Sequence, residues 1–414
     1  MKSTYILMFI FMLSNYLTVH SQEEPKEPLA KLWNIENDEI LKYLSIEKNL
    51  SIVDNILKSL LDDVNFGGTN INVIKNMIFI NTLNFTKAAE IKTSIEIRQY
   101  ISLLNFIRAD NSTAKLSSRF QDIDNLAKSY IPKYCMGYIN SEINNIIIAS
   151  CNETRNETSN TAFINAINDR MYYPIFTYYN CFNRSNNEVS KRKGGDIGKV
   201  GDIGNRILAG DGIESDEGTC SAGFLARSHS NIKYIATAGH CYNPGSYYLL
   251  PWNSTTSTVL IGEMQNYLVE PIDFGLIYIG NPIIQPVPSV RNTDSERYNE
   301  LPIEDIISVS SNGAHLCLSG FFSHVRCGYV TALNGFTSDG EVHNNNIIVV
   351  NLRYIPGDSG GPIFSYKDLT HVSLNGILRG GLFDFHDNIN GIAGVITINS
   401  ILSVFNFLEV VTVP

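Results

Sequence analysis

The segment PGDSGGP at residues 356–362 decides how this chain is interpreted. It places Ser359 in a turn built from glycines, with Asp358 directly before it. Such a turn exposes the serine hydroxyl, and the backbone N–H groups of Gly357 and Ser359 point to one position. Two N–H donors at one position suit an oxygen on which negative charge develops during nucleophilic attack. The segment therefore predicts a nucleophilic serine and an oxyanion hole formed by Gly357 and Ser359.

A serine hydroxyl is a poor nucleophile alone, so a base and an acid are expected elsewhere in the chain. The sequence TAGHC at 237–241 supplies His240, and IDFGL at 272–276 supplies Asp273. A lone histidine is usually a packing or surface residue, and a lone aspartate usually caps a turn. The order histidine, aspartate, serine instead favours a catalytic triad. In that triad His240 carries the proton of Ser359, and Asp273 orients the histidine.

The chain has 414 residues, which predicts more than one domain. Residues 1–21 have the pattern of a signal peptide, with Lys2 followed by an apolar run from Ile6 to Leu17. This run is too short for a comfortable membrane span. We therefore expect a secreted, extracellular protein without a membrane partner.

Glycosylation sequences and cysteines agree with secretion. The chain contains 7 cysteines, an odd number, so at least one is unpaired or linked to another chain. Some Asn-x-Ser/Thr sequences are expected by chance, because asparagine is abundant. They occur at Asn49, Asn84, Asn111, Asn152, Asn156, Asn183 and Asn253.

Residues 22–187 are predicted to form a small α+β domain without a catalytic constellation. Apolar residues at helical spacing predict a helix over 40–61. A hairpin is expected over 70–81, a second helix over 91–107, and a strand around 146–148.

Residues 188–206 are a linker in which glycine, lysine and aspartate dominate. The basic cluster KRK at 191–193 and the residue Arg206 are expected processing sites, with Arg192 and Arg206 as the cleaved positions. The alternative for both is a solvated charge run.

The pattern changes at Ile207. Short strand signals separated by Gly, Asn, Pro and Ser predict an all-β domain over 207–414. Acidic residues strongly outnumber basic ones here, which argues against nucleic acid as a partner. Two explanations of this uneven charge are open. A basic first half could dock on this acidic half, or the charges could only keep the chain soluble. No metal-ligand spacing is present, and no cofactor is expected. The expected strands are 224–226, 234–237, 247–250, 259–261, 274–279, 325–333, 347–352, 361–364 and 392–398, with a short helix over 400–408.

Three separated stretches carry a resemblance to a known family. The first is ILAGD at 207–211, which leads through CSAGF at 220–224 to His240. The second is CGYVTALN at 327–334, and the third is the Ser359 segment. Over residues 207–414 the chain resembles chymotrypsin-fold serine proteases, most closely the streptogrisin and α-lytic protease branch. The resemblance implies a double β-barrel.

The resemblance also implies two disulfides, Cys220 with Cys241 and Cys317 with Cys327. One of the remaining cysteines is then free or linked to another chain. These are Cys135, Cys151 and Cys181.

Proteases of this branch carry large propeptides that assist folding and then inhibit the mature enzyme. Residues 22–187 have the size and position of such a propeptide, and FGGTN at 66–70 is similar to a propeptide segment. The alternative is an independent accessory or binding domain.

The chain departs from the family beside the nucleophile. The family holds the aspartate there with an arginine that follows the first cysteine of the second disulfide, but Leu318 stands at that position. Asp358 therefore needs another partner. The candidates are Arg326 and the new α-amine of Ile207 that cleavage after Arg206 releases.

A second departure concerns substrate binding. The substrate-binding strand of the family reads Ser-Gly-Gly, whereas here Arg379 precedes Gly380 and Gly381. The glycines suit the close approach of a substrate backbone. The family's cysteine pair near the specificity pocket is absent, and an uncharged pocket that prefers apolar side chains is expected.

Together these features predict a monomeric, secreted serine endopeptidase that is made as a proenzyme and cleaves polypeptides through an acyl-enzyme. The alternative is a non-catalytic binding protein on a protease scaffold.

Overall fold

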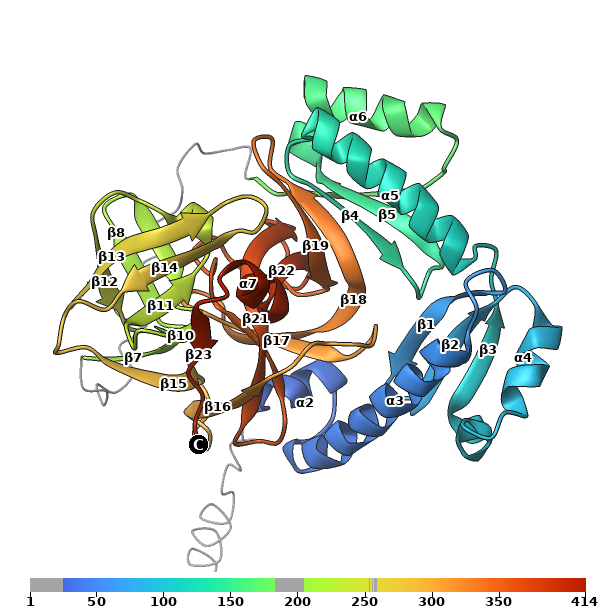
Figure 1. Cartoon of the computed structure of the whole chain (residues 1–414), viewed down its shortest axis with the longest axis horizontal. Coiled ribbons are helices and arrows are strands. Elements are labelled where there is room, and N and C mark those ends of the chain that lie inside the picture. The colour runs from blue at the N-terminus through green and yellow to red at the C-terminus, as the bar shows by residue number, and fades with distance from the viewer. Residues whose placement is uncertain (1–24, 183–204, 253, 255, 257–258) are drawn as a thin grey trace, which may run out of the picture.

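The computed structural model describes residues 25–182 and 205–414, except 253, 255, 257 and 258 (Figure 1). The expected signal peptide, the processing position Arg192 and the glycosylation sequences at Asn183 and Asn253 lie outside the described residues. Below, residues 25–182 are the N-terminal region and residues 205–414 are the C-terminal domain. No helix among the described residues is long and apolar enough to cross a membrane.

The C-terminal domain begins with a curved sheet that wraps around its own core. The strand order is β23-β10-β11-β14-β13-β12-β8-β9. Residues that point inward from these strands, such as Ile213, Leu225, Ile235, Leu249 and Ile277, form one apolar cluster. The strands are β8 (Gly212–Ser215), β9 (Gly218–Ser221), β10 (Phe224–Ser228), β11 (Lys233–Thr237), β12 (Ser246–Leu250), β13 (Val259–Leu268), β14 (Phe274–Tyr278) and β23 (Leu408–Val410).

The second half of the domain is a closed barrel. Its strands are β17 (His315–Gly320), β18 (His324–Ser338), β19 (His343–Val350), β20 (Pro362–Tyr366), β21 (Val372–Phe383) and β22 (Gly391–Thr397). Around the ring, β18 pairs with β17, β17 with β20, β20 with β21, β21 with β22, β22 with β19, and β19 again with β18. Leu316, Leu318, Ile363, Leu378 and Val395 fill the interior. The expected all-β double barrel is confirmed.

Further elements join the two barrels. The strands β7 (Arg206–Ala209) and β15 (Gln285–Arg291) pair in parallel, and β16 (Glu300–Ile306) connects β15 to β21. The C-terminal helix α7 (Ile398–Val404) starts two residues earlier than expected, because the Thr397 side chain caps it by accepting the N–H of Ser400. After α7 the chain returns to the first sheet as β23.

The first part of the N-terminal region is a small α+β unit, as expected. The helix α3 lies along the sheet β1-β2-β3, and its Leu50, Val53 and Leu57 pack with Phe66 and Ile78 of that sheet (Figure 1). The elements are α2 (Pro28–Trp33), η1 (Asn37–Glu39), α3 (Ile40–Leu60), β1 (Phe66–Asn72), β2 (Met77–Thr82), α4 (Phe85–Lys92), η2 (Arg98–Leu103) and β3 (Leu104–Arg108).

One prediction in this unit is wrong. The apolar spacing over 91–107 predicted a helix, but α4 ends at Lys92, and the last residues of the segment form β3. β3 pairs in parallel with β2, with Phe106 opposite Ile80. Pairing across the sheet therefore outweighs the local helical spacing.

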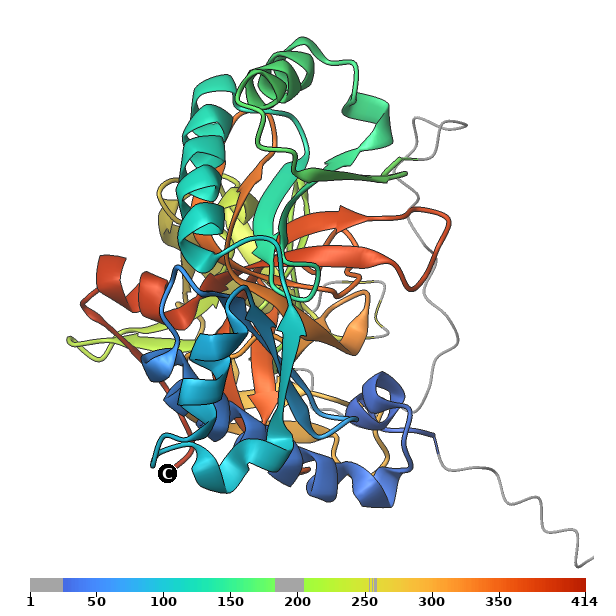
Figure 2. The same ribbon diagram turned by 90° about the vertical axis from the view of Figure 1, so that its right-hand side faces the viewer.

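The second part of the N-terminal region extends the second barrel. Its strands continue the sheet in the order β6-β5-β4-β18, because β4 pairs with the end of β18 from Gly335 to Ser338. The helices α5 and α6 cover one face of this extension (Figures 1 and 2). Phe120 of α5 stacks on Phe336 of β18 at a centroid distance of 5.9 Å. The elements are α5 (Thr113–Tyr130), β4 (Cys135–Asn140), β5 (Asn145–Cys151), α6 (Thr158–Asp169) and β6 (Ile175–Tyr179).

The cysteines of the N-terminal region divide into one pair and one free thiol. Cys151 and Cys181 form a disulfide, which fixes the end of β5 to the segment after β6. Cys135 is free and buried, and burial raises the pKa of its thiol to about 12. The thiol is therefore neutral and unreactive near neutral pH.

Candidate active site

The histidine, aspartate and serine predicted to form a triad lie in turns that the strands bring together. His240 sits in a short 3₁₀ turn (Gly239–Cys241) after β11, Asp273 directly precedes β14, and Ser359 lies in the turn before β20. His240 Nδ1 lies 2.6 Å from Asp273 Oδ2, and the backbone N–H of His240 donates to Asp273 Oδ1 at 2.8 Å. His240 and Ser359 line the same cavity, which has a volume of about 670 Å³.

The environments of Asp273 and His240 differ as a catalytic triad requires, with a buried carboxylate beside an accessible imidazole. Asp273 is 1% exposed, whereas the His240 side chain is 40% exposed. Burial by itself raises the pKa of Asp273, but the neighbouring His240 and then Arg379 outweigh it, so the pKa lies below its usual value. Asp273 is therefore an anion at neutral pH. No hydrogen bond joins the His240 ring to Ser359 among the described residues, and such contacts often form only with substrate bound.

The glycines of the serine turn are needed for its backbone geometry. Gly357 has φ 104° and Gly360 has φ 81°, both in the left-handed region. A Cβ on Gly357 would lie 2.3 Å from the Phe322 ring. The N–H groups of Gly357 and Ser359 donate to no acceptor in the described part of the chain. Both donors are thus available to a substrate oxygen, as an oxyanion hole requires.

Asp358 is held by backbone groups rather than by a cation. It is fully buried, and it accepts hydrogen bonds from the N–H groups of Phe322, Ser323 and Ile355 at 2.9, 3.1 and 2.7 Å. Burial raises the pKa of Asp358 despite these bonds.

Arg326 does not contact Asp358 in this structure, and the α-amine of Ile207 stays a prediction, because it would exist only after cleavage at Arg206. Arg326 donates instead to the carbonyl oxygens of Ser323 and Asn388. Ile207 lies in β7 as an internal residue, where it pairs with Pro286 of β15. Backbone amides leave no pattern in the sequence, because every residue except proline carries one.

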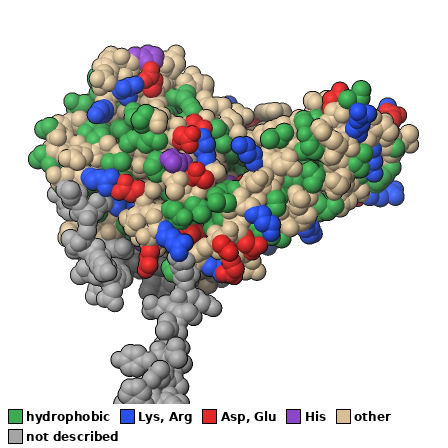
Figure 3. All heavy atoms as spheres, turned by 90° about the horizontal axis from the view of Figure 1, so that it is seen from below, with side chains coloured by type: hydrophobic (Ala, Val, Ile, Leu, Met, Phe, Trp, Pro, Cys, Tyr) green, Lys and Arg blue, Asp and Glu red, His purple; other side chains and the backbone are tan. Residues whose placement is uncertain are grey.

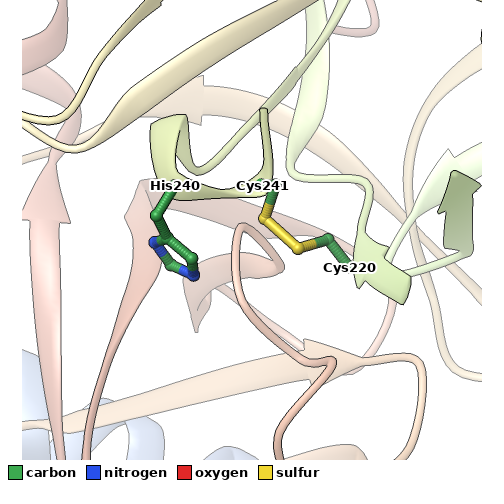
Figure 4. A group of neighbouring side chains, drawn as sticks. All are labelled: Cys220, His240 and Cys241. Atoms are coloured by element: carbon green, nitrogen blue, oxygen red, sulfur yellow. A yellow bond between two sulfur atoms is a disulfide. The ribbon is translucent and has the colours of Figure 1, made fainter. Parts of the chain in front are cut away.

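The turn that carries His240 is fixed by a disulfide. Cys220 and Cys241 are bonded, with a Cα–Cα distance of 6.3 Å (Figure 4). Cys317 and Cys327 form a second disulfide between β17 and β18. Although Cys220, His240 and Cys241 lie close together, both sulfur atoms are consumed in the disulfide, so the group offers no thiolate to a metal ion.

The expected substrate-binding strand is the end of β21. Gly380 has φ 142° and lines the cavity together with Gly381. The hydroxyl of Tyr354 bonds to both polar groups of Gly381, accepting from its N–H at 2.9 Å and donating to its carbonyl oxygen at 2.8 Å. Burial raises the pKa of Tyr354 to about 12, so this hydroxyl stays protonated. No local sequence pattern marks Tyr354 as a site residue.

Arg379, which stands where the family has serine before the two glycines, also lies at the site. Its Nε is 3.4 Å from Asp273 Oδ2, and its Nη2 donates to Asp339 Oδ2 at 2.7 Å. The burial of Asp339 raises its pKa, but the N–H of Val342 and the Arg379 charge together hold the pKa below its usual value.

The N-terminal region forms one wall of the cavity. Four of its residues lie there: Lys133, Tyr134, Cys135 and Ser159. After β6, the carbonyl oxygen of Asn180 accepts the N–H of Phe385 at 2.8 Å, so the chain contacts the loop between β21 and β22. Access to His240 and Ser359 is therefore restricted on that side.

Carboxylates of the N-terminal region bond to buried groups of the C-terminal domain. The tightest pair joins Glu47 of α3 to His315 of β17, with Nδ1 and Oε2 2.5 Å apart. A basic first half docking on an acidic second half is thus not the basis of these contacts, and Figure 3 shows acidic and basic side chains interspersed on the face seen there. The pairs are Glu47 with His315, Asp54 with Ser311, and Asp124 with His343.

Comparison with known proteins agrees with the resemblance inferred from the motifs. No model of a known protein family matches the chain. Serine protease 1 of Streptomyces fradiae is 28% identical over 165 residues, which is 38% of this chain and 42% of that protein. The match thus spans less than half of the relative's length.

Two solved structures of proteases are also similar to this chain. Thermobifida fusca protease A shares 24% identity with a TM-score of 0.42, and the match covers 50% of this chain and 100% of that one. The Nocardiopsis protease shares 19% identity with a TM-score of 0.41, at the same coverage of both chains.

Proposed function

We propose that this chain is a serine endopeptidase, secreted as a proenzyme, that cleaves polypeptides through an acyl-enzyme. The observation that carries the proposal is the 2.6 Å contact of His240 with the buried Asp273, in one cavity with Ser359. The two unpaired N–H groups of the serine turn support it further.

In the proposed mechanism, Ser359 Oγ attacks the scissile carbonyl carbon while His240 Nε2 takes its proton. The carbonyl oxygen becomes an oxyanion, which the N–H groups of Gly357 and Ser359 stabilise. His240 then gives the proton to the leaving amine as the acyl-enzyme forms. Water, activated by His240, releases the acyl group, and Asp273 stabilises the imidazolium in both steps.

The N-terminal region fits the role of a propeptide that assists folding and then inhibits. Two features support this role: the sheet that β4 shares with β18, and the wall that Lys133 and Tyr134 form at the cavity. Processing is proposed at Arg192 and Arg206. Arg206 lies in β7 and forms an ion pair with Glu300, so cleavage after it requires β7 to detach locally from β15.

A fluorophosphonate label tests the proposed function, because it reacts only with an activated serine hydroxyl. The processed, secreted chain should be labelled at Ser359, and Ser359→Ala should abolish labelling without loss of folding. The unprocessed full chain should label more slowly, because the N-terminal region still restricts the cavity. Absence of labelling in the processed chain, beside a reactive control protease, would overturn the enzyme reading in favour of a binding protein on a protease scaffold.

A further inference from the structure

Arg379 brings a fixed positive charge to the buried carboxylate of the triad. Its Nε lies 3.4 Å from Asp273 Oδ2, the oxygen that His240 Nδ1 also contacts. Asp273 is 1% exposed and the Arg379 side chain 11% exposed. Solvent therefore screens this pair only weakly, and the charge acts on Asp273 at short range.

Groups outside the triad hold Arg379 in this place. Its Nη2 donates to Asp339 at 2.7 Å, and its Nε donates to Asn344 Oδ1 at 3.1 Å. Asp339 is itself fixed in the turn between β18 and β19, because it accepts the N–H groups of Glu341 and Val342. A planar guanidinium can face Asp273 and Asp339 at once, which a lysine ammonium does less well.

Two roles fit an arginine in this position. A structural role would only anchor β21 to the turn between β18 and β19, and the proton equilibrium at the triad would not depend on it. A fixed positive charge 3.4 Å from Asp273 has a further effect, because it opposes protonation of the carboxylate on which the triad depends. The two roles therefore differ in the pH dependence of the reaction.

We infer that Arg379 is a positioning residue of the triad, whose charge keeps Asp273 ionised and so preserves the contact of this carboxylate with His240. It does not touch the reacting atoms and acts through Asp273. The inference rests on the proposed protease function, since it concerns the proton transfer from Ser359 to His240.

The test is the rate of fluorophosphonate labelling of the processed chain as a function of pH, which needs no knowledge of the peptide substrate. The variants are Arg379→Gln, Arg379→Lys and Asp339→Asn. The matched control is Arg227→Gln, since Arg227 forms an ion pair of 2.9 Å with Glu409 on the first sheet, away from the cavity.

Loss of the Arg379 charge should make the triad bind a proton more readily. For Arg379→Gln, the midpoint of the acid limb should rise by about one pH unit. The labelling rate on that limb should fall by about tenfold, which corresponds to one such unit. Arg379→Lys keeps a positive charge, so its midpoint should rise less than that of Arg379→Gln. The midpoint of Arg227→Gln should equal that of the unchanged chain.

Asp339→Asn should shift the midpoint of the acid limb in the opposite direction, and it leaves Arg379 itself unchanged. It removes a negative charge beside the guanidinium, so the midpoint should move to lower pH. This variant also decides the matter if Arg379→Gln fails to fold. Midpoints that stay unshifted in the Arg379 and Asp339 variants, while the unchanged chain is labelled, would overturn the inference and leave the proposed function standing. Failure of the unchanged chain to label would overturn both.

Discussion

At the scale of single residues, Asp358 shows how a buried carboxylate next to the nucleophile is held without a cation. Its carboxylate oxygens accept hydrogen bonds from the backbone N–H groups of Phe322, Ser323 and Ile355. These bonds exist in the uncleaved chain, so the serine turn does not depend on a new N-terminus for its support. In the proposed proenzyme, activation therefore needs the cavity to be exposed, and the turn need not be rebuilt.

Replacing Asp358 with alanine should therefore destabilise the fold. Buried N–H groups left without an acceptor cost roughly 1–3 kcal/mol each, less the gain from no longer burying a carboxylate, so a net loss of about 3 kcal/mol in the free energy of unfolding is expected. Urea denaturation of the full chain, which keeps the N-terminal region, measures it.

The control for this variant is Asp368→Ala. Asp368 also accepts backbone N–H groups, from Thr370 and His371, but it lies in an exposed turn. Its loss should stay below about 1 kcal/mol, because water replaces the lost acceptor. Equal losses for the two variants would contradict the account of Asp358.

Arg379 should also make stability depend on pH. The pKa values of Asp273 and Asp339 are lowered in the folded chain, by contributions that include the Arg379 charge. A lowered carboxyl pKa contributes stability that is present above the unfolded value, about 4, and is lost as the pH falls through the folded value. Arg379→Gln should accordingly reduce the free energy of unfolding at neutral pH, and the difference from the unchanged chain should shrink in acid.

Urea denaturation at a series of pH values measures this dependence. Arg227→Gln is again the control, and its small effect should not vary in the same way. A destabilisation by Arg379→Gln that is constant from neutral pH into acid would mean that Arg379 stabilises the fold by packing, not by charge.

At the scale of elements, the turn between β18 and β19 is held from both sides. Inside the domain, Asp339 and Asn344 bond to Arg379. From outside, β4 pairs with the end of β18, and Asp124 of α5 contacts His343 and Asn345 at 2.9 and 3.1 Å. Docking of the N-terminal region thus fixes the same hairpin that carries the partners of Arg379.

Asp124→Asn should loosen this docking. The amide keeps the size of the side chain but weakens the contact with His343, so strand pairing at Gly335–Ser338 should open more often. Loss of one charge-assisted hydrogen bond corresponds to amide exchange that is roughly tenfold faster in this segment of the full chain. Hydrogen exchange followed by mass spectrometry measures it.

The same helix provides the control for this prediction. Asp122 pairs with Arg170 at 2.6 Å inside the N-terminal region, so Asp122→Asn should leave exchange at Gly335–Ser338 unchanged. Similar acceleration by both variants would show that α5 itself is destabilised rather than its contact with β19.

The same elements show what the sequence could and could not predict. His240, Asp273 and Ser359 were found because each sits in a short turn with a local pattern. The contact of Arg379 with Asp273 could not be predicted in this way, because it depends on which loop lies beside β21. The pairing of β4 with β18 joins residues about two hundred positions apart, for which local periodicity carries no signal.

At the scale of the whole molecule, the two halves of the chain complete each other's polar contacts. His315 of the second barrel is buried, and it bonds to Glu47 of α3 and accepts the N–H of Tyr366 at 2.9 Å. Ser311 likewise donates to the buried Asp54. Without the N-terminal region, the C-terminal domain lacks these partners and the strand β4 beside β18.

The C-terminal domain alone should therefore refold poorly. Its barrels depend on pairings between distant strands, such as β10 with β23, and folds with mostly non-local contacts form slowly. Early docking of the N-terminal region would fix β18 and β19 and reduce the number of open strand edges. Residues 207–414 should recover activity toward fluorophosphonate in low yield alone, and in high yield when residues 22–187 are added in trans.

A Glu47→Gln form of the added region should help less, because it weakens the contact with His315, whereas a Glu142→Gln form, changed at an exposed position, should help fully. Efficient unaided refolding of residues 207–414 would reject the folding role and leave the N-terminal region as an inhibitor or an accessory domain.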